Sequence, residues 1–183
     1  MRLDSRDRVA TQRDIPAKDE PHIAPDGTLR ATRIAGVVVH EGGNIITRNG
    51  HTTELFSSPW DLPVDCVRHV IHVSLRPAAI SAWHMHERQT DQIIAVDGML
   101  KLVLHDPRDD SPTNGQTDVF HLSPMRPTLV LIPPGVWHGI QNMNAASFSS
   151  FINLFDRPYE HDSPDEWRLP LRNDVIPFDF TTE

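Results

Sequence analysis

Lysine, cysteine and long apolar runs are scarce in this chain of 183 residues, and each scarcity excludes a class of function. Only two of the 17 basic residues are lysines, Lys18 and Lys101, so a reaction that needs a lysine has almost no residue to carry it. Cys66 is the single cysteine, which excludes an internal disulfide and C-x-x-C chemistry. No apolar run approaches the roughly 18 residues that span a bilayer, so we expect no membrane segment.

The charge balance and the first residues narrow the partners and the compartment. The formal net charge is −8, which argues against binding to nucleic acid or to an anionic membrane surface. Residues 1–7 lack the apolar core of a secretory signal. Together with the single cysteine, this predicts a cytoplasmic protein.

The chain divides into a polar arm and one domain. Residues 1–30 are polar, mixed in charge and contain Pro16, Pro21 and Pro25. We predict that they form an N-terminal arm, which is loose or lies on a partner subunit. Residues 31–183 have the length of a single domain.

Short apolar stretches alternate with turn residues after Ile34, and none has a convincing helical period over twelve residues. Turns recur about every 8–12 residues, which is typical of an all-β sandwich or barrel. An immunoglobulin-like sandwich lacks its Cys…Trp…Cys pattern here. Asp97-Gly98 is a hairpin signal. The predicted strands are residues 36–40, 70–75, 80–86, 92–96, 99–105, 117–122, 128–132, 137–142 and 147–155.

Histidines gather in two segments of this pattern. His84 and His86 stand two residues apart on a predicted strand, where alternate side chains share a face. A turn can return Asp91 to their side, and His138 follows a second, proline- and glycine-containing turn. Three imidazoles and one carboxylate suit a divalent transition metal such as Zn, Fe, Mn or Ni. We therefore predict these four residues as metal ligands.

The spacing of these residues resembles the two-part signature of the cupin superfamily. The first part reads H-x-H, four residues, a carboxylate, six residues and Gly98; the second reads P-x-G-x-x-H-x-x-x-N and ends at Asn142. Asp91 stands where the first motif normally has Glu. The resemblance implies a double-stranded β-helix, or jelly-roll barrel, with its site in the mouth of the barrel.

A narrower resemblance covers roughly residues 70–180. After Gly98, a strand leads into D-x-R at Asp106 to Arg108 and then S-P-T-x-G at residues 111–115. Residues 132–139 read I-P-x-G-x-x-H-G. Both segments resemble the dTDP-4-dehydrorhamnose 3,5-epimerases. The resemblance implies a homodimer that moves a proton beside the ketone of a nucleotide-linked 4-keto sugar, with His84 in the place of the catalytic base.

Several functional residues of that family are missing. Ser81 to Trp83 replaces the arginine that grips diphosphate, and Gln92 or Ile93 falls where a lysine stabilises the enolate. The acid tyrosine falls near Ile152 or Asn153. The orienting aspartate falls within residues 167–170, where no Asp stands. Tyr159, the only tyrosine, aligns with a second family tyrosine and is the predicted catalytic partner of His84.

These departures lead to the hypothesis that a metal replaces the missing lysine as the electrophile. A conflict follows, because His84 cannot be a metal ligand and the free base at once. Either His84 binds metal and another group moves the proton, or His84 is the base and no metal is bound. Glu87, Gln89 and Tyr159 are the other nearby polar groups.

The predicted substrate-binding residues are Gln89, Gln92 and Asn142. The expected function is an epimerase- or isomerase-like cupin that acts on a nucleotide-linked or free keto sugar. Two alternatives stay open: a metal cupin of dioxygenase type, and a sugar-binding cupin without catalytic activity.

Overall fold

The computed structural model describes residues 34–64 and 66–181, together with Ile23 and Pro25. The predicted arm, residues 1–30, therefore lies outside the described residues except for those two. All named elements are β-strands. In the part of the chain that the structure describes, no helix is long and apolar enough to cross a membrane.

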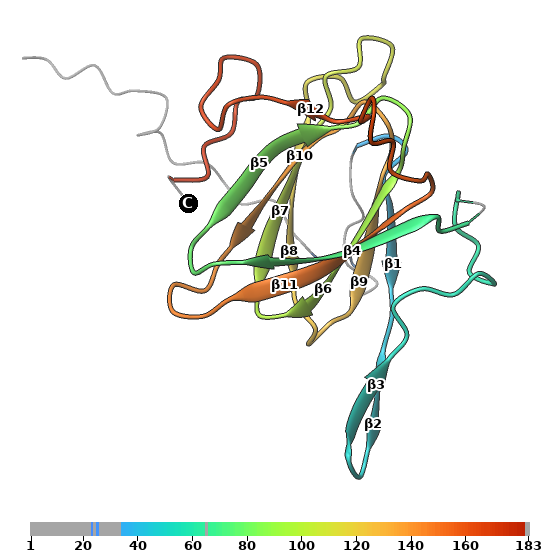
Figure 1. Ribbon diagram of the computed structural model, residues 1–183. Coiled ribbons are helices and arrows are strands. Elements are labelled where there is room, and N and C mark those ends of the chain that lie inside the picture. The colour runs from blue at the N-terminus through green and yellow to red at the C-terminus, as the bar shows by residue number, and fades with distance from the viewer. Residues whose placement is uncertain (1–22, 24, 26–33, 65, 182–183) are drawn as a thin grey trace, which may run out of the picture. The chain divides into compact units, whose positions relative to one another are not determined.

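Two five-stranded antiparallel sheets face each other (Figure 1). The first sheet contains, in spatial order, β1 (Val38–Glu41), β9 (Thr128–Ile132), β6 (Asp91–Asp97), β11 (Ser149–Phe155) and β4 (His69–Leu75). The second contains β12 (Trp167–Arg168), β5 (Ile80–Met85), β10 (Trp137–Asn142), β7 (Leu100–His105) and β8 (Thr117–Leu122). This order is that of a jelly roll, so the predicted all-β jelly-roll barrel is confirmed.

A small hairpin stands apart from both sheets. Its strands are β2 (Asn44–Thr47) and β3 (Gly50–Thr53), and they pair only with each other. Figure 1 shows this hairpin projecting away from the barrel.

The core fills the space between the sheets and continues on both outer faces. In β6, Ile93 and Ala95 point into the barrel, whereas Ile94 packs on the outer face with the segment that contains Trp60. Trp83, which is fully buried, packs on the outer face of the second sheet against Phe180. Strand alternation thus buries both sides of the central strands.

The turn at Asp97-Gly98 does not make the predicted hairpin. β6 and β7 belong to different sheets, so this turn carries the chain across the barrel. Gly98 has φ +71°, and a Cβ there would lie 2.0 Å from Ser149 Oγ. The left-handed conformation and the close approach both require glycine. The resulting Asp-Gly pair is also typical of hairpin turns, so the sequence could not distinguish the two.

The D-x-R segment braces the loop between β7 and β8. Asp106 is fully buried and accepts hydrogen bonds from Arg108 Nε at 2.7 Å and from the hydroxyls of Ser111 and Thr113 at 2.6 Å. Burial alone would raise the pKa of Asp106, but these hydrogen bonds lower it well below its usual range. Arg108 also donates to the Ala35 carbonyl at 2.7 Å. The segment therefore fixes the start of the domain against the barrel.

Candidate active site

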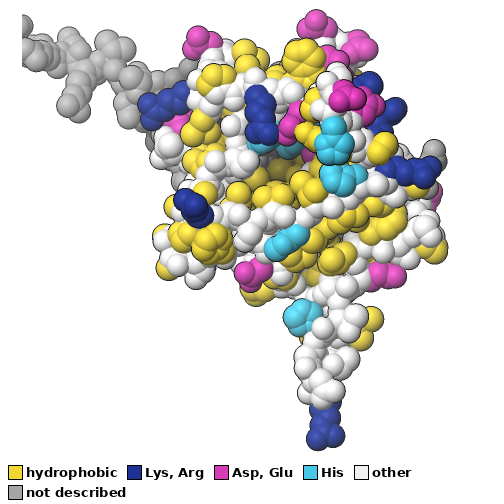
Figure 2. All heavy atoms as spheres, viewed as in Figure 1, with side chains coloured by type: hydrophobic (Ala, Val, Ile, Leu, Met, Phe, Trp, Pro, Cys, Tyr) yellow, Lys and Arg dark blue, Asp and Glu magenta, His cyan; other side chains and the backbone are white. Residues whose placement is uncertain are grey.

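A cavity of about 330 Å³ opens between the two sheets. Its walls are apolar, with Ile71, Ile93, Ile140 and Phe151 among the residues that line them. Figure 2 shows a hollow on this face, with histidine side chains gathered along its upper part. The cavity thus has an apolar body and one polar, histidine-rich end, as is usual for small-molecule sites.

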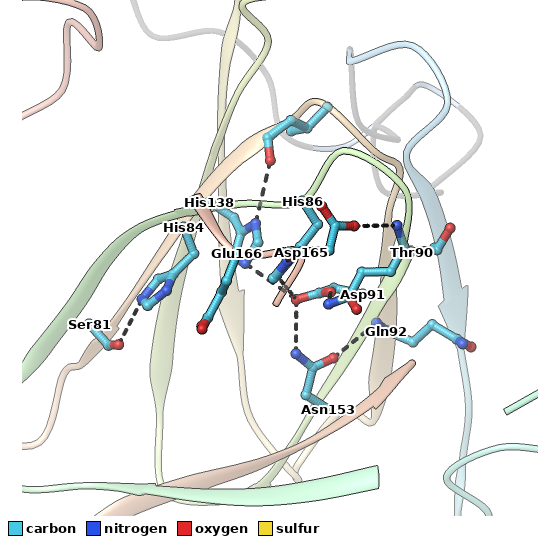
Figure 3. A network of polar contacts seen from close by, with 12 residues as sticks. Ser81, His84, His86, Thr90, Asp91, Gln92, His138, Asn153, Asp165 and Glu166 are labelled. Carbon is cyan, nitrogen blue, oxygen red and sulfur yellow. Dashed lines mark hydrogen bonds and ion pairs between the residues drawn. The ribbon is translucent and has the colours of Figure 1, made fainter. Parts of the chain in front are cut away.

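Three strand ends bring the polar groups together. His86 directly follows β5, Asp91 begins β6, and His138 is the second residue of β10. The Gly135 N–H donates to the His86 carbonyl at 2.7 Å, which ties the two histidine-bearing segments to each other. Asp91 Oδ2 lies 3.4 Å from His86 Nε2 and 3.3 Å from His138 Nε2 (Figure 3). All three residues are buried. We call them the triad.

The hydrogen bonds behind the triad determine which ring nitrogens face Asp91. His86 Nδ1 donates to the Asp165 carbonyl, and His138 Nδ1 donates to the Val136 carbonyl at 3.4 Å. A carbonyl oxygen can only accept, so each neutral imidazole directs the lone pair of its Nε2 toward Asp91. Two nitrogen lone pairs and a carboxylate oxygen repel one another unless a positive charge lies between them. The triad therefore requires added protons or a cation.

Asp91 is held in its charged form and in one orientation. Burial alone would raise its pKa, but the imidazoles of His138 and His86 beside it, which favour the ionised carboxylate once they carry a proton, lower the pKa of this carboxyl well below its usual range. Asn153 Nδ2 donates to Oδ2 at 2.9 Å, and Gln89 Nε2 donates to Oδ1 at 3.3 Å. Asn153 Oδ1 accepts the Gln92 amide at 3.1 Å, which fixes the direction of the Asn153 side chain.

His84 lies beside the triad but outside it. The three ligand atoms of the triad lie within 4.8 Å of one another, and the described residues place His84 outside that group. Its Nε2 instead bonds the Ser81 hydroxyl at 3.0 Å, and Figure 3 shows its ring turned toward Ser81. The structure thus brings together three of the four predicted metal ligands, and the four-ligand set is not formed.

The environment of His84 favours its neutral form. Burial is the largest cause, and the neighbouring basic side chains of His138, Arg168 and His86 add to it and lower the pKa of His84 to about 4. His86 differs: burial alone would lower its pKa, but Asp91 outweighs this effect and the pKa is raised. His84 is therefore an uncharged imidazole at neutral pH.

Two of the predicted polar residues line the cavity and two do not. Gln89 and Tyr159 belong to the lining. Asn142 is a correction: its side chain is buried at the far end of β10, where Nδ2 donates to the carbonyls of Arg76 and Ser147 at 2.9 and 2.8 Å. It therefore closes that end of the barrel and cannot touch a molecule at the triad.

Gln92 is the second correction. It follows Asp91 on β6, so its side chain points to the opposite, outer face of the sheet (Figure 3). It is fully buried there, and neither its Oε1 nor its Nε2 has a hydrogen-bond partner among the described residues. Direct contact with a molecule in the cavity is excluded by this placement.

We expect Gln92→Met to stabilise the protein by about 1–2 kcal/mol, because a buried amide without partners costs free energy that a thioether of similar length does not. Urea unfolding measures the difference. Any reaction in the cavity should stay at the wild-type rate, since Gln92 lies outside the cavity lining. A loss of activity without loss of stability would contradict the placement of Gln92.

Several cavity residues had no signal in the sequence. Asn153 stands where the resembled family has a tyrosine, but nothing in its neighbours indicates a bond to Asp91. Asp165 reaches the triad from a polar stretch that reads as a solvated loop. Arg168 pairs with His84 in the register of β12 and β5 and also lines the cavity. Asp165 and Arg168 contact residues roughly 80 positions earlier in the chain, and such a distant contact produces no local pattern in the sequence.

Comparison with known proteins agrees with this architecture. The family described as dTDP-4-dehydrorhamnose 3,5-epimerase matches residues 31–169. The spore coat polysaccharide biosynthesis protein SpsL of Bacillus subtilis strain 168 is 38% identical over 107 residues, which cover 58% of this chain and 70% of SpsL. The probable low-salt glycan biosynthesis epimerase Agl13 of Haloferax volcanii is 33% identical over 138 residues, which cover 74% of this chain and 87% of Agl13.

Solved structures show the same fold. The crystal structure of a dTDP sugar isomerase from Desulfovibrio desulfuricans G20 has a TM-score of 0.76 at 23% identity and covers 82% of this chain and 94% of its own. The 3'-monoepimerase ChmJ of Streptomyces bikiniensis, in complex with dTDP-quinovose, has a TM-score of 0.68 at 20% identity and covers 77% of this chain and 73% of its own. The chain therefore belongs to the dTDP-4-dehydrorhamnose 3,5-epimerase family and is an isomerase-type enzyme on a cupin jelly roll.

Proposed function

We propose that this enzyme epimerises a nucleotide-linked 4-keto sugar at a carbon beside the ketone. Family membership supports the reaction class, and the names of the similar structures refer to dTDP sugars. The observation that carries the proposal is the position of His84, which lines the cavity next to the triad but stays outside it. Membership in an isomerase family favours this reaction over a dioxygenase or a sugar-binding protein.

His84 is the base in this proposal. We assign the tautomer in which Nε2–H donates to the Ser81 hydroxyl, which leaves the lone pair on Nδ1 to accept the proton from the carbon beside the ketone. The electrons of the broken C–H bond move to the ketone oxygen and form an enolate. A second proton then adds to the same carbon from the opposite face, and exchange with water afterwards removes the proton from His84 and restores the one on the donor. Tyr159, the one tyrosine of the chain, lines the cavity and is the proposed donor. No oxidant or reductant is needed.

The triad holds a divalent transition metal in this proposal. A metal about 2.1 Å from each of two tetrahedral ligands keeps those ligands about 3.4 Å apart. The observed separations of 3.3 and 3.4 Å between Asp91 Oδ2 and the two Nε2 atoms fit that value. With a proton on each Nδ1, both Nε2 atoms would face the same carboxylate oxygen with lone pairs, so the donor set fits a cation.

A metal bound at the triad would supply the positive charge that stabilises an enolate oxygen, a task for which the described residues of the cavity lining include no lysine. The arrangement also removes the conflict over His84, because three other residues hold the metal while His84 stays free as the base. The triad and His84 form one polar end of the cavity. Gln89 is the proposed polar contact for the sugar there, because it lines the cavity beside Asp91.

Solvent isotope exchange tests the proposed function. The full chain is incubated with a dTDP-linked 4-keto sugar in D₂O, and the product is followed by mass spectrometry and NMR. We expect deuterium at a carbon beside the ketone at a rate far above that of the substrate alone. Exchange no faster than in the absence of protein would contradict the proposal. The homodimer and the cytoplasmic location stay predictions from the sequence.

A further inference from the structure

The cavity mouth is bordered by residues 157–168, which we call the mouth segment. The cavity lining includes several residues of this segment, among them Tyr159, Glu160, Asp165, Glu166 and Arg168. The segment ends in β12, which pairs with β5 and sets Arg168 opposite His84. The position of the mouth segment therefore decides how open the polar end of the cavity is.

One carboxylate fastens this segment to the turn after β5. Asp165 Oδ1 accepts the Glu87 amide at 2.9 Å, and Oδ2 accepts the amides of Arg88 and Gln89 at 2.8 and 3.2 Å. The Asp165 side chain is only 10% exposed. Its backbone carbonyl accepts His86 Nδ1. A single residue thus binds both the turn and the ring of a triad histidine.

Other contacts across this junction are weaker. Arg88 and Glu160 form an ion pair at 3.0 Å, but both side chains are about half exposed, so the pair contributes little. Arg157 Nε donates to the Arg88 carbonyl at 2.8 Å from an exposed position. Three backbone amides bound to one half-buried carboxylate are stronger, because the acceptor is charged and the bonds converge on one side chain. Asp165 is therefore the main fastening between the two segments.

We propose that Asp165 is a latch that couples metal binding at the triad to closure of the mouth segment, an inference that rests on the proposed metal site. When the segment is latched, the Asp165 carbonyl holds the His86 proton on Nδ1 and so directs the Nε2 lone pair to the metal. When it is unlatched, the ring of His86 is free to turn. Coupling between two equilibria is reciprocal, so a bound metal stabilises the closed segment as much as the latch strengthens metal binding.

Asp165→Ala removes the acceptor for all three amides and tests the latch. Co²⁺ is titrated into the full chain against a chelator, and hydrogen exchange of residues 157–168 is measured with and without the metal. In the wild type, we expect Co²⁺ to slow exchange in the mouth segment. In Asp165→Ala, we expect Co²⁺ to bind about 10- to 100-fold more weakly, which is the usual effect of losing a group behind a ligand, and to slow exchange much less.

Two further variants separate the latch from general destabilisation. Asp162→Ala changes an exposed carboxylate of the same segment and should leave both measurements unchanged. Asp165→Asn keeps one acceptor oxygen and should restore part of the affinity. Wild-type affinity in Asp165→Ala, with Co²⁺ still slowing exchange, would overturn the latch alone. A wild-type protein that binds no Co²⁺ at all would overturn the metal site and the latch with it.

Discussion

Asp91→Asn is expected to lower the affinity for Zn²⁺ or Fe²⁺ by more than about 100-fold, because even changes behind a ligand cost about 10- to 100-fold. Asp91 is 2% exposed and is the only carboxylate of the triad, so its loss removes the charge that two imidazoles alone cannot replace. Elemental analysis of the purified proteins and chelator competition measure the change. Epimerisation should fall by about 10³-fold or more, since a bound metal contributes several kcal/mol to an enolate-like transition state.

The matched control is Asp97→Asn, which changes an exposed carboxylate at the other end of β6. It should keep the metal content and activity of the wild type. Equal metal content in Asp91→Asn and in the wild type would show that Asp91 is not a ligand. If the wild-type protein contains no metal and takes up none, the histidines carry protons in place of a cation, and the proposed electrophile is wrong.

The sequence predicted the barrel because most of its strands carry their own signal. The alternation in β4 is the local pattern of a strand buried on one face, and the apolar stretches in β6, β7 and β9 are the pattern of strands buried on both faces. The strands β2, β3 and β12 were not predicted. The first two are short, with mostly exposed residues, and β12 has only two residues. These strands form because they pair with a neighbouring strand, and the local sequence pattern does not indicate that pairing.

The site was predicted in part, for reasons of strand geometry. His86 and Asp91 flank one turn, and His138 follows a turn that His86 contacts, so motif spacing sufficed to bring them together. Gln92 was misplaced because one step along a strand reverses the face. Asn142 shares a strand face with His138, but four residues along a strand span about 13 Å, which puts it at the other end of the barrel.

The role of His84 depends on a feature that spacing cannot show. The H-x-H pattern predicts two histidines on one strand face, both available to a metal. β5 ends at Met85, so His86 lies beyond the strand, where Asp165 holds its ring. His84 stays on the strand and bonds Ser81 three residues earlier. The end of the strand therefore gives the two histidines different surroundings, which the pattern alone had treated as equivalent.

His84→Gln tests that separation directly. Loss of a positioned general base costs about 10²- to 10⁴-fold in rate, so we expect kcat for epimerisation and deuterium exchange to fall by about 10³-fold. Metal content and affinity should match the wild type, because the triad is intact. Glutamine keeps a side chain of similar length that can still bond Ser81, so the shape of the cavity end should change little.

Ser81→Ala is the companion variant, because it keeps His84 and removes only its hydrogen bond. The loss of one such bond is worth about 1 kcal/mol, so a fall in kcat of about fivefold to tenfold is expected, again with wild-type metal content.

Loss of metal together with activity in His84→Gln would make His84 a ligand and restore the conflict between ligand and base. Retained epimerisation in His84→Gln would assign the base to another cavity residue. If His84 is a base that does not bind the metal, His84→Gln should lose activity and keep its metal, because His84 then takes part only in the proton transfer.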